Sequence, residues 1–437
     1  MATAKPRLLY ANRTQCELRS DSVEQVLPAD HPVRAIWAFV ERLDLTALFA
    51  RIRSVPGHAG APAIDPRILV ALWLQATADG IGSSRALARL CVEHLAYRWL
   101  VGQVEVGYHT LADFRTDHGE VLNDLLSQSV AVLLHEDLID LKRVAQDGLR
   151  VRAAAGSSSF RRSRSIEECL TAARSQVAAL QSQADEDDGA ASRRQQAARE
   201  RAARERVERL ERAAEELKTL QDANETQSPS RRKDPETLRA STTDPESRRM
   251  KMPDGGFRPA YNVQLATTTA GGVIVGVDVT SEGTDATQMT PMIEQIETRF
   301  DRRPEEMLVD GGFATVESID AAERGGTTVY APVREEQKQL DRGQDPYARK
   351  KSDTDATAVW RARMGTEEAK AIYCLRGCTA EWANAQVRNR GLYAVTVRGQ
   401  KKVLAVVLWY ALLHNLWRWK TLRATASGER AASEGAR

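Results

Sequence analysis

The sequence is poor in cysteine, in long apolar runs and in net charge. Its five cysteines are scattered over 437 residues, which argues against a disulfide framework and indicates a reducing compartment. Cys374 and Cys378 form one C-x₃-C pair, but no second pair completes a zinc site. We interpret these two residues as ordinary thiols.

No segment has the composition of a secretory signal or of a membrane span. The N-terminus, MATAKPRLLYANRTQ, lacks an apolar core. The longest apolar run, Val403–Leu413, is too short to cross a bilayer at a rise of about 1.5 Å per residue, and predicts a buried helix. We expect a cytoplasmic protein that does not bind a membrane.

The net charge of +2 excludes the overall basic character of many small DNA-binding domains, so basic charge is local. Between Lys142 and Arg164 there are seven Lys or Arg and one acid, Asp147. Between Glu381 and Arg423 there are eight Lys or Arg and one acid, Glu381. Each run alone fits a solvated face, but the isolation of both acids favours a site that receives a polyanion.

The length and the 42% apolar content predict a globular protein of two or three structural units. We divide the chain into an N-terminal helical, DNA-binding domain, the first part of an α/β core, a helical hairpin with its linker, the rest of the core, and a disordered tail. Their bounds are 1–138, 139–155, 156–240, 241–423 and 424–437.

Residues from about 30 to 138 have the pattern of a helical domain. Asp30-His31-Pro32 and Asp65-Pro66 each place a cap before a proline, Gly80–Ser84 separates two helices, and Thr110–Asp113 resembles a capping box. Glycine-containing turns between short helices are compatible with a helix-turn-helix and equally with a small bundle. The candidate DNA contacts, each of which could instead lie on a solvated helix face, are Arg85, Arg89, His109, Arg115 and His118.

A heptad-like pattern follows from residue 166 to residue 217. Apolar residues recur in 4-3-4-3 spacing before and after the acidic segment 185–189, which predicts an antiparallel helical hairpin. The hairpin could pair with a second subunit or lie along DNA; we prefer an exposed arm with dimer contact. The polar segment Gln227–Asp234 is interpreted as a linker.

The remaining segments alternate between strand and helix patterns. The predicted elements are a first strand Val144–Val151, a hairpin of Tyr261–Ala266 with Val273–Thr280, a helix Gln288–Phe300, a strand Glu306–Asp310, a helix Val316–Arg324 and a strand Thr327–Val333. This order predicts an α/β (mixed α+β) fold, with a mixed sheet and flanking helices. Residues 334–370 are expected to form a loop over the active face.

Three acids occupy positions that would suit a metal-dependent nuclease. Asp147 lies in the middle of one predicted strand, Asp310 ends another, and Glu381 opens a basic helical stretch that contains Arg388 and Arg390. Such a set can hold two divalent ions about 3.5–4 Å apart and support an in-line phosphoryl displacement. The competing candidates for the third ligand are Glu317, Glu323, Glu335 and Glu336.

The ordered motifs resemble bacterial insertion-sequence transposases of the DDE type, which have an RNase H-like core. The resemblance covers nearly the whole chain, from HPVRAIWAFVERLDL through VAQDGLRVRA, TTDPESRRMKMPDGGFRPAYNVQ, VIVGVDVTSEGTDATQM, MLVDGGF and TAEWANAQVRNRGL to LWYALLHNLWRW. It implies that Asp147, Asp310 and Glu381 are the catalytic, metal-binding acids. Tyr373, Arg376, Glu381 and Arg388 form Y-x₂-R-x₄-E-x₆-R, one residue longer than the Y-x₂-R-x₃-E-x₆-K of many such enzymes and ending in arginine.

The resemblance also implies two Mg²⁺ or Mn²⁺ ions, terminal inverted repeats and target DNA as partners, and a homodimer or higher oligomer. Cleavage at the transposon ends would be followed by strand transfer. The residues expected to meet DNA in the core are Tyr373, Arg376, Arg388, Arg390 and Lys251. Trp382 could stack on an unpaired base or belong to the core.

Two alternatives remain, a nuclease of the same fold without strand transfer and a non-catalytic or domesticated DNA-binding protein. The sequence has no P-loop, nucleophile elbow or H-E-x-x-H helix, which excludes the commoner hydrolases and NTPases.

Overall fold

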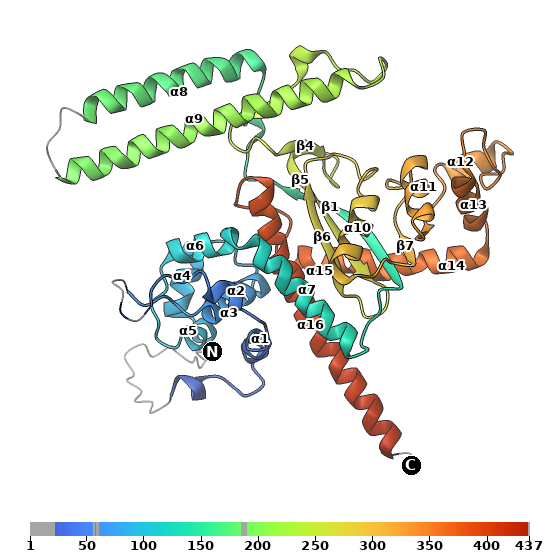
Figure 1. The fold of residues 1–437 in the computed structure, drawn as a ribbon, viewed down its shortest axis with the longest axis horizontal. Coiled ribbons are helices and arrows are strands. Elements are labelled where there is room, and N and C mark those ends of the chain that lie inside the picture. Colours follow the sequence, from blue (N-terminus) through green and yellow to red (C-terminus); the bar gives the residue numbers. More distant parts are fainter. Residues whose placement is uncertain (1–21, 56, 58–60, 185–189, 436–437) are drawn as a thin grey trace, which may run out of the picture.

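The computed structural model describes residues 22–55, 57, 61–184 and 190–435, without the side chains of 183–194 and 429–435. Cys16 and the predicted acidic turn 185–189 lie outside the described residues. A helical N-terminal part, a central sheet, a long helical hairpin and a lobe of short helices follow one another along the chain (Figure 1).

The central sheet mixes antiparallel and parallel strands, as the sequence predicted. Its order is β4-β5-β1-β7-β8. Strand β6 lies on the same side of β5 as β4, because β4 pairs with residues 257–260 of β5 and β6 pairs with residues 262–267. Strands β5 and β6 run antiparallel to their neighbours, and β7 and β8 run parallel to β1. The bounds are β1 Arg143–Arg152, β4 Arg248–Lys251, β5 Phe257–Thr268, β6 Ile274–Thr280, β7 Glu306–Leu308 and β8 Thr328–Tyr330. This α/β arrangement is that of an RNase H-like core.

Crossover helices explain the parallel half of the sheet. Helix α10 (Met289–Phe300) buries Met292, Ile293 and Ile296, and helix α11 (Val316–Arg324) joins β7 to β8. A parallel connection needs such a crossover, because the chain must return to the same end of the sheet before the next strand begins. Both helices match the predicted ranges to within one residue.

Seven α-helices and one short 3₁₀ helix form the described N-terminal part. They are η1 (Val23–Val26), α1 (Pro32–Val40), α2 (Thr46–Phe49), α3 (Pro66–Ala78), α4 (Ser84–Glu93), α5 (Leu95–Val101), α6 (Tyr108–Asp117) and α7 (Gly119–His135). Asp65 caps α3 through its side chain, as predicted, whereas at α1 the capping side chain is that of His31 and not that of Asp30. The predicted capping box at Thr110 is wrong, because α6 already begins at Tyr108 with Gly107 as its N-cap.

One long helix joins the N-terminal part to the sheet. Helix α16 (Gln400–Gly435) buries nearly all of 403–413, and these residues belong to one apolar cluster with α3, α6, β5 and β6. The Trp409 indole N–H donates to the Arg115 carbonyl of α6 at 3.0 Å. Residues 424–435, which the sequence predicted as a disordered tail, continue this helix, since extending an existing helix through alanine-rich sequence needs no new nucleus.

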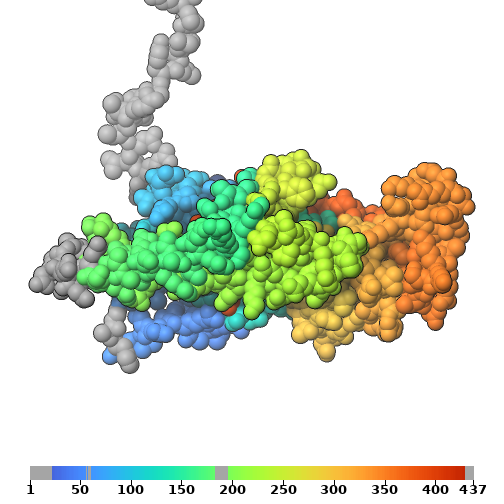
Figure 2. Space-filling view, turned by 90° about the horizontal axis from the view of Figure 1, so that it is seen from above, coloured from blue at the N-terminus to red at the C-terminus, as the bar shows by residue number. Residues whose placement is uncertain are grey.

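The predicted hairpin between β1 and β5 is present. Helices α8 (Ser163–Ala184) and α9 (Ala190–Glu225) run along one side of the molecule (Figures 1 and 2). Their base is closed by the ladder of β2 (Phe160–Arg161) with β3 (Ala240–Ser241), next to the short helices η2 (Ser157–Ser159) and η3 (Pro235–Thr237). The predicted heptad positions Ile166, Ala173, Ala203, Leu210 and Leu217 are buried.

The predicted loop at 334–370 is instead mostly helical. It contains α12 (Glu336–Asp341), α13 (Asp355–Met364) and the start of α14 (Glu367–Arg376), and α15 (Trp382–Asn389) follows. Thr354 and Thr366 cap α13 and α14, and Trp360 and Met364 are buried four residues apart. These capping and spacing signals were present in the sequence, but the many charged residues around them obscured the pattern. No helix of the described chain is both long and apolar enough to cross a membrane.

Candidate active site

Asp147 lies in the middle of β1 with both carboxylate oxygens hydrogen-bonded. Its Oδ1 accepts from the Arg376 guanidinium at 2.9 Å and from the Gly148 N–H at 3.0 Å. Its Oδ2 accepts from the Asn384 amide at 2.9 Å. The central strand therefore presents this acid to α14 and α15, where its orientation is fixed from three sides.

Asp310 lies beside Asp147 because β7 runs parallel to β1. Ala145 pairs with Leu308, and Asp147 and Asp310 each follow two residues later in the sequence, so the two acids lie side by side. Strand β7 ends at Leu308, which places Asp310 just after the strand and not at its end as predicted. The Gly312 N–H donates to Asp310 Oδ1 at 2.6 Å, and a Cβ at residue 312 would lie 2.7 Å from that oxygen. The second glycine of D-G-G is therefore required by this carboxylate.

Glu381 reaches the site through a π-turn. The turn η4 (Gly377–Glu381) separates α14 from α15, so Glu381 lies inside a continuous helical segment and does not open one. In a regular α-helix residues 376 and 381 would point about 140° apart. The wider turn brings them together, and Arg376 donates to Glu381 Oε1 at 2.8 Å. A π-turn inserts one residue into a helix, which explains how the longer R-x₄-E spacing keeps this pair.

Arg376 connects the acids electrostatically. Its side chain is 9% exposed and forms ion pairs with Asp147 and Glu381. Burial lowers the pKa of Arg376, but Asp147, Tyr373, Asp310 and Glu381 together raise it above its usual value. Burial raises the pKa of Asp147, the nearby Asp310 charge adds to this rise, and Arg376 opposes it. Asp147 and Glu381 therefore share one counter-ion, and the charge of Asp310 acts on both Asp147 and Arg376.

The donor types of this region fit a hard divalent cation, but their present spacing among the described residues does not form a cation site. Carboxylate oxygens are the ligands that Mg²⁺ and Mn²⁺ prefer. The Asn384 Oδ1, in a side chain adjoining Asp147, is buried and has no hydrogen-bond partner among the described residues. In the described part of the chain no three Asp, Glu, His or Cys side chains surround a common point. Arg376 instead bonds to both Asp147 and Glu381.

The predicted DNA-contacting cations of the core lie at different distances from the acids. Arg388 is exposed on α15, seven residues after Glu381. Arg390 is half-buried, and its guanidinium donates to the Gln386 carbonyl at 3.1 Å. Lys251 is exposed and pairs with Phe257 of β5, whereas Asp147 pairs with Leu265 of the same strand. These two positions of β5 are eight residues apart, so Lys251 and Asp147 are separated by about 27 Å along the strand. The structure does not bring Lys251 to the acids.

Arg115 does not face solvent, contrary to its selection as a DNA contact. It is buried, donates to the Gly82 carbonyl at 2.5 Å and stacks on Trp73 at 4.8 Å. It therefore supports the turn between α3 and α4. Arg85 is exposed at the start of α4 and stacks on Tyr108 at 5.0 Å.

The other N-terminal candidates have mixed surroundings. Arg89 is exposed and pairs with Glu93 at 3.4 Å, and His109 is exposed. His118 is half-buried beside Arg51, and burial followed by that charge lowers the pKa of His118.

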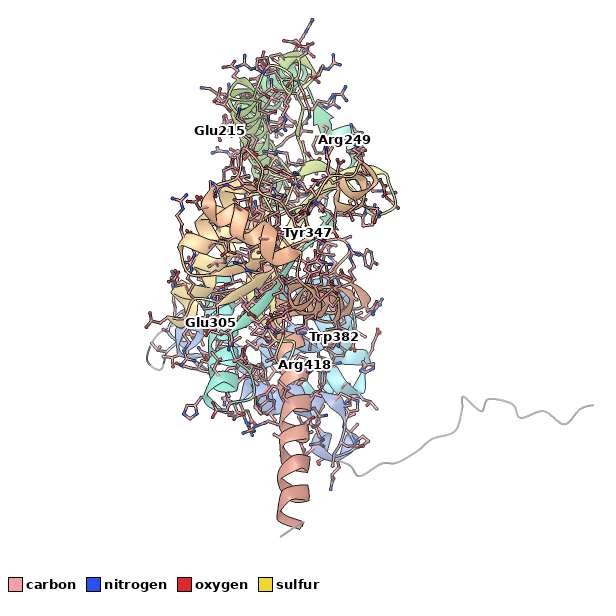
Figure 3. The ribbon with its side chains drawn as sticks, turned by 90° about the vertical axis from the view of Figure 1, so that its right-hand side faces the viewer. Glu215, Arg249, Glu305, Tyr347, Trp382 and Arg418 are labelled. Atoms are coloured by element: carbon pink, nitrogen blue, oxygen red, sulfur yellow. The ribbon has the colours of Figure 1, made fainter. Side chains whose placement is uncertain are left out.

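Trp382 belongs to the core packing. Arg418 stacks on its ring at 5.2 Å, and both residues are seen together at the start of the protruding part of α16 (Figure 3). His414 meets the same ring edge-on at 5.2 Å. Arg418 therefore covers one face of the Trp382 ring, which agrees with the interpretation of Trp382 as part of the core.

Asn384 was missed at the sequence level. It lies three residues after Glu381 and donates to Asp147, yet a lone asparagine in a helix carries no signal. The i, i+3 spacing, which places both residues on one helix face, was the only indication available.

Comparison with known families agrees with this geometry. Residues 21–117 match a transposase domain (DUF772), and residues 231–416 match a transposase DDE domain. No curated protein and no solved structure gives a significant match. With transposase-domain matches in both its N-terminal and its C-terminal part, the chain is consistent with a DDE transposase of an insertion sequence.

Proposed function

We propose that this protein cleaves DNA at the ends of its insertion sequence and joins those ends to target DNA, with Asp147, Asp310 and Glu381 as the catalytic acids. The observation that carries the proposal is that Arg376 joins β1 to the π-turn, since it contacts Asp147 and Glu381 at 2.9 and 2.8 Å. The register of β1 with β7 supports Asp310 as the third member.

The three acids would hold two Mg²⁺ or Mn²⁺ ions. Bound there, these ions would supply an activated water and charge stabilisation in phosphodiester exchange. Asn384 fixes the carboxylate plane of Asp147, and the Gly312 N–H fixes that of Asp310. Arg376 keeps two of the acids close together despite their like charge. When cations bind between the acids, the Arg376 side chain would have to move aside.

Exposed cations of the core and of the N-terminal helices would contact the DNA backbone. Arg388 lies on the helix that follows Glu381, and Arg85 is exposed near the α3–α4 turn, which contacts the segment after α15 through Thr396. Phosphate contacts of this kind position the duplex without reading its sequence. The terminal inverted repeats would then be held between the N-terminal helices and α15, in a homodimer or higher oligomer that brings two ends together.

The test is cleavage and joining of a DNA fragment that carries the terminal repeats. We expect Mg²⁺-dependent cleavage and joining, reduced at least about 10³-fold, or about 4 kcal/mol, in Asp147→Ala, Asp310→Ala and Glu381→Ala. Glu305→Ala is the matched control, because Glu305 is an exposed acid that pairs only with Lys142 at 3.8 Å.

The outcomes separate the alternatives. Cleavage without joining would indicate a nuclease of the same fold. Binding without cleavage would indicate a non-catalytic or domesticated DNA-binding protein. Activity that survives all three substitutions would rule out these acids.

A further inference from the structure

A cavity of about 290 Å³ lies at the carboxyl ends of β7 and β8, next to the Asp310 loop. Its walls come from the start of α11, the segment after β8, the approach to α13 and α13 itself. The lobe that contains it lies at the end of the molecule remote from the N-terminal helices (Figure 1). Ligands of α/β proteins commonly bind at the carboxyl ends of parallel strands, where the following helix begins.

The polar groups of this cavity are donors and cations. Arg334, Lys350 and Arg361 are among its lining residues, which include no acid. Arg361 is neutralised by Asp353 at 2.8 Å. Arg334 uses its Nε to bond the Gly311 carbonyl at 3.1 Å, and Lys350 bonds the neutral Gln339 side chain at 2.7 Å. Within the described residues neither of these two cations forms an ion pair, although Lys350 lies near enough to Asp353 to help lower the pKa of that acid. The wall of the cavity therefore carries more cations than the one nearby acid neutralises.

Trp360 adds an unsatisfied donor. It lines the cavity and is only 4% exposed, and its buried indole N–H has no acceptor among the described residues. A buried donor without a partner costs stability, so an acceptor oxygen that reached this N–H would be favoured. Helix α11, capped by Thr315 at the cavity wall, directs the positive end of its dipole to the same space.

We propose that this cavity binds a backbone phosphate of the DNA strand that passes Asp310, through Arg334, Lys350 and the Trp360 N–H. The inference deepens the proposed function, since it names a substrate subsite beside the same acids. Arg334 ties the subsite to the catalytic loop, because it bonds the carbonyl of Gly311, the residue after Asp310. A phosphate seated here would fix the strand relative to the Asp310 carboxylate.

The test measures equilibrium binding of a terminal-repeat duplex in EDTA at several salt concentrations, where no cleavage occurs. Loss of one phosphate contact reduces the slope of log K against log salt by about 0.9. We expect this reduction in Arg334→Gln and in Lys350→Gln. Arg324→Gln is the matched control, because Arg324 lies at the far end of α11 in an ion pair with Asp320 and should leave the slope unchanged.

Trp360→Phe keeps an aromatic ring and removes only the donor. We expect about tenfold weaker DNA binding at an unchanged salt slope, together with a melting temperature of the free protein no lower than that of the parent. A purely structural Trp360 would instead lower the melting temperature and leave binding unaltered, which would overturn its assignment. If Arg334→Gln fails to fold, Lys350→Gln still decides the test, because Lys350 is exposed and its ammonium group makes one hydrogen bond among the described residues, to Gln339.

Inorganic phosphate and a deoxynucleoside monophosphate serve as free-anion probes. If they raise the melting temperature of the parent but not of Lys350→Gln, while the DNA salt slopes stay equal, the cavity binds a free anion and the DNA assignment is wrong. Equal slopes with no response to either probe would also overturn it. Both results are independent of Mg²⁺-dependent cleavage, so they do not bear on the catalytic acids.

Discussion

The two halves of the candidate site are built differently. On the β1 side, Asp147 receives hydrogen bonds from Arg376, Asn384 and the Gly148 N–H. On the β7 side, Asp310 accepts only the Gly312 N–H among the described residues, and the neighbouring cavity holds unpaired cations. Among the described residues, the protein thus holds one half of the site by several contacts of its own and the other half by few.

Loss of the buried guanidinium should have the largest effect on stability. Arg376→Met leaves Asp147 and Glu381 without their counter-ion and should lower the free energy of unfolding by about 3–5 kcal/mol. Arg334→Gln on the β7 side should change it by less than about 0.5 kcal/mol, since Arg334 is exposed. Urea denaturation of both variants measures the difference. Similar losses in the two variants would contradict the contrast between the halves.

Acid should weaken the β1 side selectively. His414 of α16 packs against Trp382, and burial lowers the pKa of His414 to about 4. Above pH 6.5, the pKa of histidine in the unfolded chain, His414 is neutral in both states and costs no stability. As the pH falls from 6.5 toward 4, the unfolded chain binds a proton that the folded protein does not, and the free energy of unfolding falls by about 3 kcal/mol in all. His414→Gln should remove this pH dependence in urea denaturation at pH 7, 5.5 and 4. Parallel curves for parent and variant would show that His414 does not titrate in this way.

The amide that orients Asp147 should contribute less. Asn384→Ala removes a hydrogen bond to a charged acceptor and should lower the free energy of unfolding by about 2 kcal/mol. Asn389→Ala, at the exposed end of the same helix, is the control and should change it by less than about 0.5 kcal/mol. Equal effects in thermal unfolding would mean that the Asn384 bond is not formed in solution.

Two glycines should respond in opposite directions. Gly312→Ala places a Cβ 2.7 Å from Asp310 Oδ1 and should cost about 1 kcal/mol, with at least tenfold slower cleavage. Gly377→Ala meets no atom within 4 Å at helical φ and should stabilise by about 0.5 kcal/mol. Chemical denaturation together with the cleavage assay distinguishes the two. A harmless Gly312→Ala would show that the carboxylate is not held by that N–H.

Local patterns in the sequence predicted much of the fold. Alternation and β-branched residues located β5 and β6, and the heptad spacing located the α8–α9 hairpin. The isolation of Asp147 and Glu381 in basic runs pointed to the site before any fold was known. These features depend on neighbours in the chain, which is why they can be read from it.

The features that the sequence did not predict depend on contacts between distant segments. Arg115 was selected as a surface cation, but its burial follows from the Gly82 carbonyl and from Trp73, which lie more than thirty residues away in the sequence. The role of Asn384 depends on Asp147, a separation of 237 residues. The π-turn depends on where α14 and α15 must both pack, and the spacing of the motif alone showed only that one residue was extra.

We propose that residues 147, 310 and 381 surround one divalent-cation site. Iron(II)-dependent hydroxyl-radical cleavage tests it directly, because Fe²⁺ binds divalent-cation sites that have oxygen ligands and the radicals cut only the nearby backbone. We predict cuts in all three segments, around 147, 310 and 381, that Mg²⁺ suppresses together. Cuts confined to one segment, or cuts that Mg²⁺ does not suppress, would contradict a shared site.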